Sequence, residues 1–290
     1  RHTGVTLEPR SILVDWNPAE GQMTAWHATQ APHMIQTVLA KHLDLPEGRV
    51  RVICDDVGGS YGIKVHVYPD EVATAAIAKI MARPIKFVAD RLESFTTDIH
   101  ARDHEIGARI AVDADGKILA MDIDDWTAIG AYSVYPRTSA IEGNQVVNLC
   151  GGPYDFANYR AQTSVVFQNK TPTCQYRAVG HPIAVAVTEG LVDMAAAELG
   201  MDPVEIRRRN MYADDAYPVT SPAKMRFEGL SHHASMDKLM ALMDYDGLRA
   251  EQAELRKKGI HRGIGIASFI ELTNPSPFMY GIGGARISAQ

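Results

Sequence analysis

Strand-forming and helix-forming segments alternate along this chain of 290 residues, and the alternation is the feature that most constrains its fold. β-branched or alternating runs predict strands at residues 11–16, 21–27, 50–54, 85–88, 104–112, 118–126, 160–167 and 263–272. Apolar residues at helical spacing predict helices at residues 32–43, 70–82, 183–199, 235–243 and 248–258, and another beginning at Pro203. Some strands are joined by tight turns, such as Asp113–Gly116, and others are separated by a helix. The pattern therefore predicts an α+β, or mixed α/β, architecture.

The composition argues against several classes of protein. The formal net charge is -6, so no basic surface predicts binding to nucleic acid or to an anionic membrane. No apolar run reaches the roughly 18 to 20 residues that span a bilayer. The three cysteines, Cys54, Cys150 and Cys174, are too far apart to suggest a zinc site or an iron–sulfur cluster. Reduced thiols are typical of the cytoplasm, where we expect the protein to be located.

A glycine-rich segment, Gly58–Gly62, directly follows the predicted strand at residues 50–54. Glycines at such a place let the backbone approach a ligand and offer its N–H groups to an anion. The spacing is neither that of a P-loop nor GxGxxG, so the segment alone is equally compatible with a tight structural turn.

A second loop, residues 171–182, precedes the predicted helix at residues 183–199. It places Arg177 between Tyr176 and Ala178. The planar guanidinium donors of an arginine suit an oxo or phosphate group. Taken alone, the loop fits an ordinary surface or ion-paired arginine better.

Five segments of the chain together resemble the molybdopterin-binding subunit of the xanthine dehydrogenase, aldehyde oxidase and carbon-monoxide dehydrogenase family. In order, they are Ala28–Gln30, Gly58–Lys64, Pro84–Glu93, Gln175–Pro182 and Met201–Asn210. The corresponding family patterns are Thr-Gln, GGGFGGK, RPV(K/R)…(D/T)R(E/D)E, AFRGFGGP and DP.E.R..N. Tyr61 and Ile63 replace a Phe and a Gly of the second pattern. The resemblance extends over nearly the whole chain and implies the fold of the family's molybdenum-cofactor-binding domain.

The resemblance implies a cradle for the cofactor, with no direct protein ligand to the metal. Gln30 would donate to an oxo ligand or beside the dithiolene, although it could instead cap the helix at Pro32. Tyr61 and Gly62 would present backbone N–H groups, and Arg177 would contact the oxo region. Lys64 would be solvated or pair with a phosphate. The implied cofactor-binding residues are Gln30, Gly59, Ser60, Tyr61, Gly62, Tyr176, Arg177 and Ala178.

Departures from the family pattern bear on the substrate. Val65 stands where purine hydroxylases have an acidic residue, and Gln145, within a residue or two, where they have an arginine. Val179 replaces their second aromatic residue. These three predicted substrate-pocket residues argue against xanthine and hypoxanthine. Ala178 stands where carbon-monoxide dehydrogenases have a copper-bridging cysteine. The resemblance thus implies hydroxylation of an aldehyde or an N-heteroaromatic substrate, with water as the source of oxygen.

The resemblance also implies what completes the enzyme. Residues 1–290 would form the first cofactor-binding domain, whole or as two subdomains divided near residues 170–180. The chain begins at Arg1 without Met and would be one piece of the family's subunit. The general-base glutamate is expected downstream, so we expect no catalytic residue and no activity in the isolated chain.

The expected partners are the C-terminal half of the molybdenum subunit, an iron–sulfur subunit and an FAD subunit, to which electrons would pass. The cofactor would be molybdopterin, in the cytosine dinucleotide form. Three alternatives stay open: a non-catalytic cofactor-binding or assembly module, a carbon-monoxide dehydrogenase-like protein without the copper-binding cysteine, and a nucleotide-binding protein that shares the glycine-rich segment.

Two groups of residues outside these motifs suggest no separate site. His100, His104 and the pair His232-His233 have no carboxylate partners at helical spacing, so we expect no metal site there. Asp55-Asp56 is better explained by turn formation than by Mg²⁺ binding.

Overall fold

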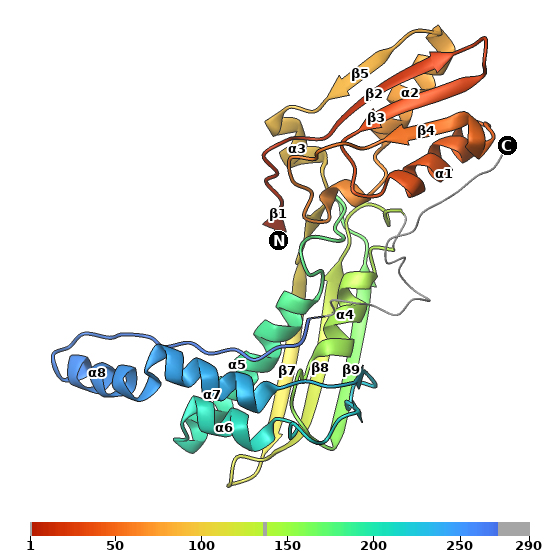
Figure 1. Ribbon diagram of the computed structural model, residues 1–290. Coiled ribbons are helices and arrows are strands. Elements are labelled where there is room, and N and C mark those ends of the chain that lie inside the picture. Colours follow the sequence, from red (N-terminus) through yellow and green to blue (C-terminus); the bar gives the residue numbers. More distant parts are fainter. Residues whose placement is uncertain (1, 136–137, 272–290) are drawn as a thin grey trace. The chain divides into compact units, whose positions relative to one another are not determined.

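The computed structural model describes residues 2–135 and 138–271 (Figure 1). The chain forms two compact units. Unit 1 comprises Arg1–Arg109, Asp122–Asn148 and Arg160–Ile183, and unit 2 comprises Ile110–Met121, Leu149–Tyr159 and Ala184–Gln290. Among the described residues, no helix combines the length and the hydropathy that crossing a membrane would require. The predicted mixed α/β fold is confirmed.

Unit 1 contains a four-stranded sheet in the order β4-β3-β2-β5. The strands are β2 (Ser11–Asn17), β3 (Gln22–His27), β4 (Val50–Ile53) and β5 (Ile85–Val88). Strands β2 and β3 form an antiparallel hairpin, whereas β3 and β4 are parallel because α1 (Pro32–His42) lies between them in the sequence. Alternate residues of the hairpin, such as Val14 and Ala25, are buried against α1 and against α2 (Pro69–Met81). Because β3 and β4 are parallel, the segment that leads from β3 into α1 and the segment that follows β4 lie at the same end of the sheet.

A second sheet has the order β7-β8-β9, and its strands contribute residues to both units. They are β7 (His104–Val112), β8 (Ile118–Ala128) and β9 (Asn158–Val166). The predicted turn between β7 and β8 is confirmed, because Asp113 N–H donates to the Lys117 carbonyl (3.0 Å) and Gly116 has a φ of 80°. Unit 1 also contains α3 (Arg91–Thr97) and most of α4 (Ile141–Leu149), neither of which was predicted.

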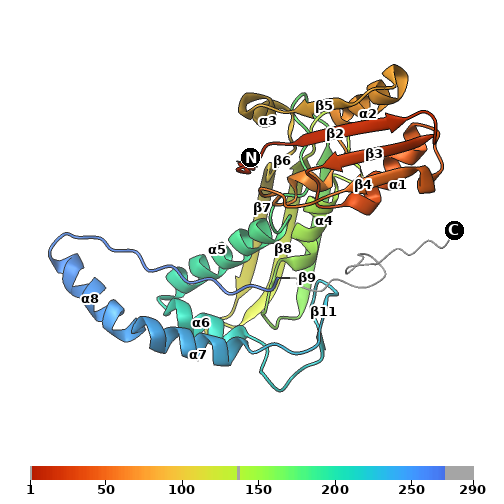
Figure 2. The same ribbon diagram turned by 45° about the horizontal axis from the view of Figure 1, so that its top comes forward.

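Helices make up most of the regular secondary structure in the described part of unit 2 (Figure 2). They are α5 (His181–Leu199), α6 (Pro203–Asn210), α7 (His232–Met243) and α8 (Tyr245–Lys257), and the first three residues of α5 belong to unit 1. Both ribbon views show α6 beside α7. The side chain of Asn210, at the end of α6, is fully buried: it accepts from Ile118 N–H and donates to the carbonyl of Gly116, each at 2.8 Å. This bridge gives a structural reason for the final Asn of the DP.E.R..N pattern.

Short elements complete the described chain. The pairs β1 (His2–Thr3) with β6 (His100–Ala101) and β10 (Val219–Thr220) with β11 (Arg226–Phe227) form two-stranded sheets, and Glu47–Arg49 and Ile63–Val65 are 3-10 turns.

The strand predicted at residues 263–272 is wrong for its described part, since residues 263–271 form no strand. Ile264 and Ile266 instead pack against the core of unit 2. Their alternation therefore reflects one buried side of an extended segment rather than a sheet.

Candidate functional site

The glycine loop, residues 58–62, has a backbone that few other sequences would adopt. Gly59, Tyr61 and Gly62 all have positive φ angles, of 101°, 54° and 95°. A Cβ atom on Gly62 would lie 2.8 Å from the carbonyl oxygen of Gln175, so this position requires glycine for both conformation and space. The loop is also tied to the N-terminal segment, because Glu8 N–H donates to the Gly58 carbonyl (3.0 Å) and the Glu8 carboxylate accepts from Gly58 N–H (2.8 Å).

Gln30 lies against the glycine loop. Its side-chain oxygen accepts hydrogen bonds from the Ser60 hydroxyl and from Gly62 N–H, the latter at 3.1 Å. The expectation that Gly62 N–H faces the cofactor is therefore wrong, because Gln30 uses this group. The alternative role as a helix cap is wrong, since Ala31 is the N-cap of α1 and no side chain caps it. Because the amide oxygen is used within the chain, the group that exposed Gln30 offers to a ligand is its –NH₂ donor.

The arginine loop, residues 175–180, contacts the glycine loop directly. Arg177 N–H donates to the Tyr61 carbonyl (2.8 Å), and the Arg177 guanidinium carbon lies 5.8 Å from the centre of the Tyr61 ring. Both side chains are exposed, and within the described residues Arg177 has no carboxylate partner. Ala178 and Val179 also have positive φ angles, of 71° and 52°. The two segments singled out in the sequence are thus brought together, 116 positions apart at Arg177 and Tyr61 (177 − 61).

The predicted substrate-pocket residues are placed differently from one another. Gln145, on α4, accepts from Gly180 N–H at 3.0 Å and so supports the arginine loop. Val179 is half-buried in that loop, and Val65 is half-buried in the 3-10 turn Ile63–Val65. Their contact with a substrate stays a prediction.

Lys64 corrects one expectation. It is neither solvated nor free for a phosphate, because its side chain is 1% exposed and its ammonium lies 2.9 Å from the Glu8 carboxylate. Burial raises the pKa of Glu8, but its hydrogen bonds to Lys64 and Gly58 outweigh this effect, and the pKa lies below its ordinary value. Lys64 therefore fixes the N-terminal segment against the glycine loop.

Arg102 is a residue of this site that the sequence motifs did not reveal. Its guanidinium donates to the carbonyls of Tyr176 (3.3 Å) and Arg177 and lies over the Tyr176 ring, 4.8 Å from its centre. Arg102 is separated from these partners by more than 70 positions, so no local pattern signals the contact.

A buried ionic cluster lies next to Arg102. His104 contacts the Asp125 carboxylate through Nδ1 (2.7 Å) and the Glu142 carboxylate through Nε2 (3.5 Å). Burial lowers the pKa of His104, but hydrogen bonds and charge interactions with the two carboxylates outweigh it and raise the pKa to about 9. His104, which seemed to lack acidic partners, is therefore held as an imidazolium. Among the described residues, no group of three or more His, Cys, Asp or Glu side chains is arranged to hold a metal ion.

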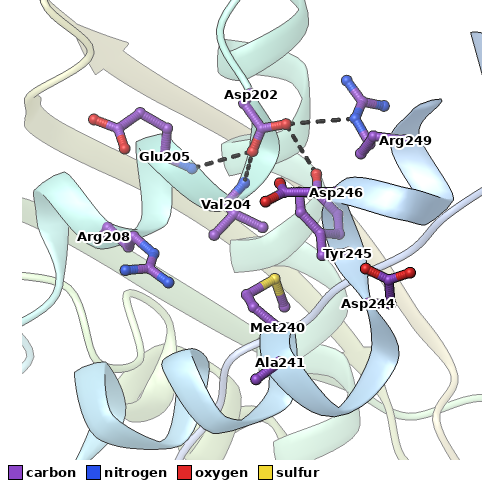
Figure 3. A pocket seen from close by; sticks show the side chains of 10 residues that line it. All are labelled: Asp202, Val204, Glu205, Arg208, Met240, Ala241, Asp244, Tyr245, Asp246 and Arg249. Carbon is purple, nitrogen blue, oxygen red and sulfur yellow. Dashed lines mark hydrogen bonds and ion pairs between the residues drawn. The ribbon is translucent and has the colours of Figure 1, made fainter.

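Two pockets of about 560 Å³ each lie elsewhere. One, in unit 1, is lined by residues including His66, Tyr68 and Tyr135, and by none of the predicted cofactor-binding residues. The other, in unit 2, lies among α6, α7 and α8 (Figure 3). Its Asp202 accepts from Val204 N–H (2.8 Å) and from the Tyr245 hydroxyl (2.9 Å), so it already has partners within the chain.

The joined loops can bind an anionic or oxo-bearing ligand. Arg177 and the Gln30 amide are exposed donors, and among the described residues no hydrogen bond uses Tyr61 N–H. This donor set fits a molybdenum cofactor, whose oxo and phosphate groups accept hydrogen bonds.

Comparison with known proteins identifies relatives of this chain. Residues 1–211 match the family model of the molybdopterin cofactor-binding domain. The carbon monoxide dehydrogenase large chain of Hydrogenophaga pseudoflava is 30% identical over 279 residues, which cover 93% of this chain and 34% of that protein. The nicotine 6-hydroxylase large subunit of Paenarthrobacter nicotinovorans is 32% identical over 288 residues, which cover 98% and 35%.

A solved structure shares the fold. Quinoline 2-oxidoreductase from Pseudomonas putida 86 superimposes with a TM-score of 0.84 at 30% sequence identity, over 89% of this chain and 33% of that one. The chain thus spans about a third of the length of the relatives it matches.

Proposed function

The chain belongs to the family of molybdopterin cofactor-binding domains, and on this premise we propose that the glycine loop and the arginine loop form one wall of a molybdenum-cofactor site. The hydrogen bond from Arg177 N–H to the Tyr61 carbonyl carries this proposal, because it holds the two loops side by side. When bound, the cofactor supplies the redox centre. The residues of this chain bind and orient it.

Each residue of the wall has a role set by its hydrogen-bonding groups. The Arg177 guanidinium and the Gln30 –NH₂ donate to oxo or phosphate oxygens, and Tyr61 N–H is a third donor. Ser60 and Gly62 hold the Gln30 amide so that its oxygen is occupied and its –NH₂ remains to donate. Donors fixed before the ligand arrives lose little freedom on binding, which favours tight binding.

We propose that the complete enzyme hydroxylates an N-heteroaromatic compound or an aldehyde with oxygen from water. Relatives named for nicotine 6-hydroxylation and quinoline oxidation support this substrate class. Ala178 follows Arg177, where a copper-bridging cysteine would be needed for carbon-monoxide oxidation. Electrons would pass to iron–sulfur and FAD partners, and the cofactor would be the cytosine dinucleotide form.

The binding role is tested by the molybdenum and pterin content of the purified protein and of two variants. Arg177→Ala removes a charge-assisted hydrogen bond worth about 1.5 to 3 kcal/mol, so we expect cofactor affinity to fall by roughly tenfold or more. Arg51→Ala is the control, because Arg51 is also an exposed arginine of unit 1 but lies on β4. Equal molybdenum in Arg177→Ala and the parent, or none in the parent, would contradict the proposal.

The substrate class is tested separately in the complete enzyme. We expect quinoline, nicotine or an aromatic aldehyde to reduce it and ¹⁸O from labelled water to enter the product. If the complete enzyme oxidises carbon monoxide but none of these compounds, the result would instead favour the carbon-monoxide dehydrogenase-like alternative. A protein that binds the cofactor and oxidises none of these compounds would favour an assembly module.

A further inference from the structure

Arg102 holds the arginine loop through contacts separate from the one that joins it to the glycine loop. Its guanidinium donates to the carbonyl oxygens of Tyr176 and Arg177, whereas Arg177 N–H donates to Tyr61. The peptide groups on both sides of the Arg177 side chain are therefore fixed by long-range hydrogen bonds. The Tyr176 ring packs under the same guanidinium, at 4.8 Å from its centre.

The backbone of Arg102 is held in turn by Glu142. Both oxygens of this carboxylate accept from Arg102 N–H, at 3.2 and 3.0 Å, and the carboxylate is 1% exposed. Arg102 needs such a restraint because its φ is 59°, a left-handed value that costs a residue with a Cβ roughly 1 kcal/mol or more.

Glu142 is itself fixed by the imidazolium of His104, 3.5 Å away, whose other nitrogen contacts Asp125 at 2.7 Å. The second oxygen of Asp125 accepts from the hydroxyls of Thr127 (2.7 Å) and Thr163 (2.8 Å). A buried carboxylate is tolerated only when it is paired and hydrogen-bonded, and both carboxylates here are. The chain of contacts is thus a rigid support rather than a set of mobile surface ion pairs.

The arginine loop itself needs an external restraint. Ala178 and Val179 are two consecutive residues with positive φ and a Cβ atom, at 71° and 52°. Such a conformation persists only where surrounding contacts impose it. The contacts of Arg102 with the two carbonyls that precede this pair supply part of that restraint.

We propose that Arg102, held by Glu142 and His104, is a positioning residue that keeps the arginine loop in the conformation presenting the Arg177 side chain to the ligand. This inference rests on the proposed function for the identity of the ligand. The ordering of the loop by Arg102 does not depend on that identity, so it can be tested on protein that carries no cofactor.

The test compares Arg102→Met, which keeps an unbranched apolar stem but removes the guanidinium, with Arg102→Lys, which keeps the charge but loses the planar pair of donors. Arg109→Met is the matched control, because Arg109 belongs to the same unit and is 79% exposed in an ion pair with Asp122. All are purified with any chains that accompany the protein, from cells grown without molybdate. Trypsin cleavage after Arg177 is followed by mass spectrometry, with cleavage after Arg51, inside β4, as the reference for unfolding of unit 1.

We expect cleavage after Arg177 to be about tenfold faster in Arg102→Met, intermediate in Arg102→Lys and unchanged in Arg109→Met, with no parallel rise after Arg51. Protein from molybdate-fed cells should then retain severalfold less molybdenum in Arg102→Met. Unchanged cleavage at Arg177, or an equal rise after Arg51, would overturn the positioning role. Absence of molybdenum from the parent would overturn the proposed function instead, whatever the cleavage ratio.

Because Arg102→Met could fail to fold, Glu142→Gln provides a second route to the same question. It keeps one oxygen to accept from Arg102 N–H but removes the charge that faces His104. We expect a smaller increase, of about threefold, in cleavage after Arg177. Cleavage indistinguishable from the parent in this variant would remove Glu142 from the proposed support.

Discussion

At the scale of single residues, contacts within the chain decide which groups of the candidate site remain available to a ligand. Gly62 provides a positive φ and leaves room for the Gln175 carbonyl, and Gln30 uses its oxygen within the chain while its –NH₂ remains a donor. The ammonium group of Lys64 is paired with the Glu8 carboxylate. A lysine after a glycine-rich loop is therefore no sign of phosphate binding here, because its partner comes from a segment more than 50 positions earlier.

We expect Gly62→Ala to destabilise unit 1 by about 2 kcal/mol, since the new Cβ would meet the Gln175 carbonyl at 2.8 Å and the backbone has a φ of 95°. Urea-induced unfolding measures the change. Gly48→Ala is the matched control, because a Cβ there has no atom within 4 Å. Equal stability of the two variants would show that the close approach of the loops is absent in solution.

At the scale of elements, the residue that caps helix α6 also links this helix to another one. Asp202 followed by Pro203 predicts a helix start, and Asp202 indeed accepts from the N–H groups of Val204 (2.8 Å) and Glu205 (3.4 Å). Its other oxygen accepts from the Tyr245 hydroxyl of α8 (Figure 3). One carboxylate therefore both caps α6 and links it to α8.

We expect Asp202→Ala to lower the free energy of unfolding by about 1 to 2 kcal/mol, because α6 loses its cap and the Tyr245 hydroxyl loses its acceptor. Asp202→Asn should recover most of this loss, since asparagine caps helices about as well as aspartate. The ion pair with Arg249 is partly exposed and adds little. Thermal denaturation checks the order of the three proteins, and an asparagine variant as unstable as the alanine variant would show that charge, not capping, dominates.

At the scale of the whole molecule, each unit buries an ionic cluster. Arg10 in unit 1 lies within 3.1 Å of carboxylate oxygens of Asp70, Glu71 and Asp98. Arg207 in unit 2 contacts the buried Glu189 at 2.9 Å and the exposed Asp193 at 2.8 Å. Breaking such a cluster leaves a buried charge without a partner, which costs more than the intact cluster contributes. The stability of the protein should therefore depend on pH wherever a member titrates.

A further buried cluster in unit 1, formed by His104, Asp125 and Glu142, defines one such pH range. The pKa of His104 is about 9 in the folded protein and 6.5 ordinarily, so the folded state binds the proton more tightly. Its contribution, roughly 3 kcal/mol, is complete below about pH 6.5 and is lost as the pH rises through about 9. We expect urea-unfolding free energies between about pH 6 and pH 9.5 to fall more steeply for the parent than for His104→Gln. Parallel curves would mean that His104 is not protonated between its two carboxylates.

The sequence by itself determined strands β2 to β5 and β7 to β9 and helices α1, α2 and α5 to α8, because the pattern of apolar residues that predicts such elements is local. It also singled out the two loops that the structure brings together, because the order of the motifs that carry the family resemblance can be read without knowledge of the fold. It did not reveal α3 or α4, although α4 carries Glu142, which accepts from Arg102 N–H, and Gln145, which accepts from Gly180 N–H.

Only the tertiary structure decided which side chains meet. Arg102 and Tyr176 are 74 positions apart, and His104 finds Asp125 and Glu142 on two different elements. Apolar and other residues alternate over 263–271 as in a strand, yet this segment forms no strand with any other described segment. The periodicity of one segment does not encode which neighbour it hydrogen-bonds to. Burial, charge pairing and strand pairing arise between distant segments, and the folded chain alone brings those segments together.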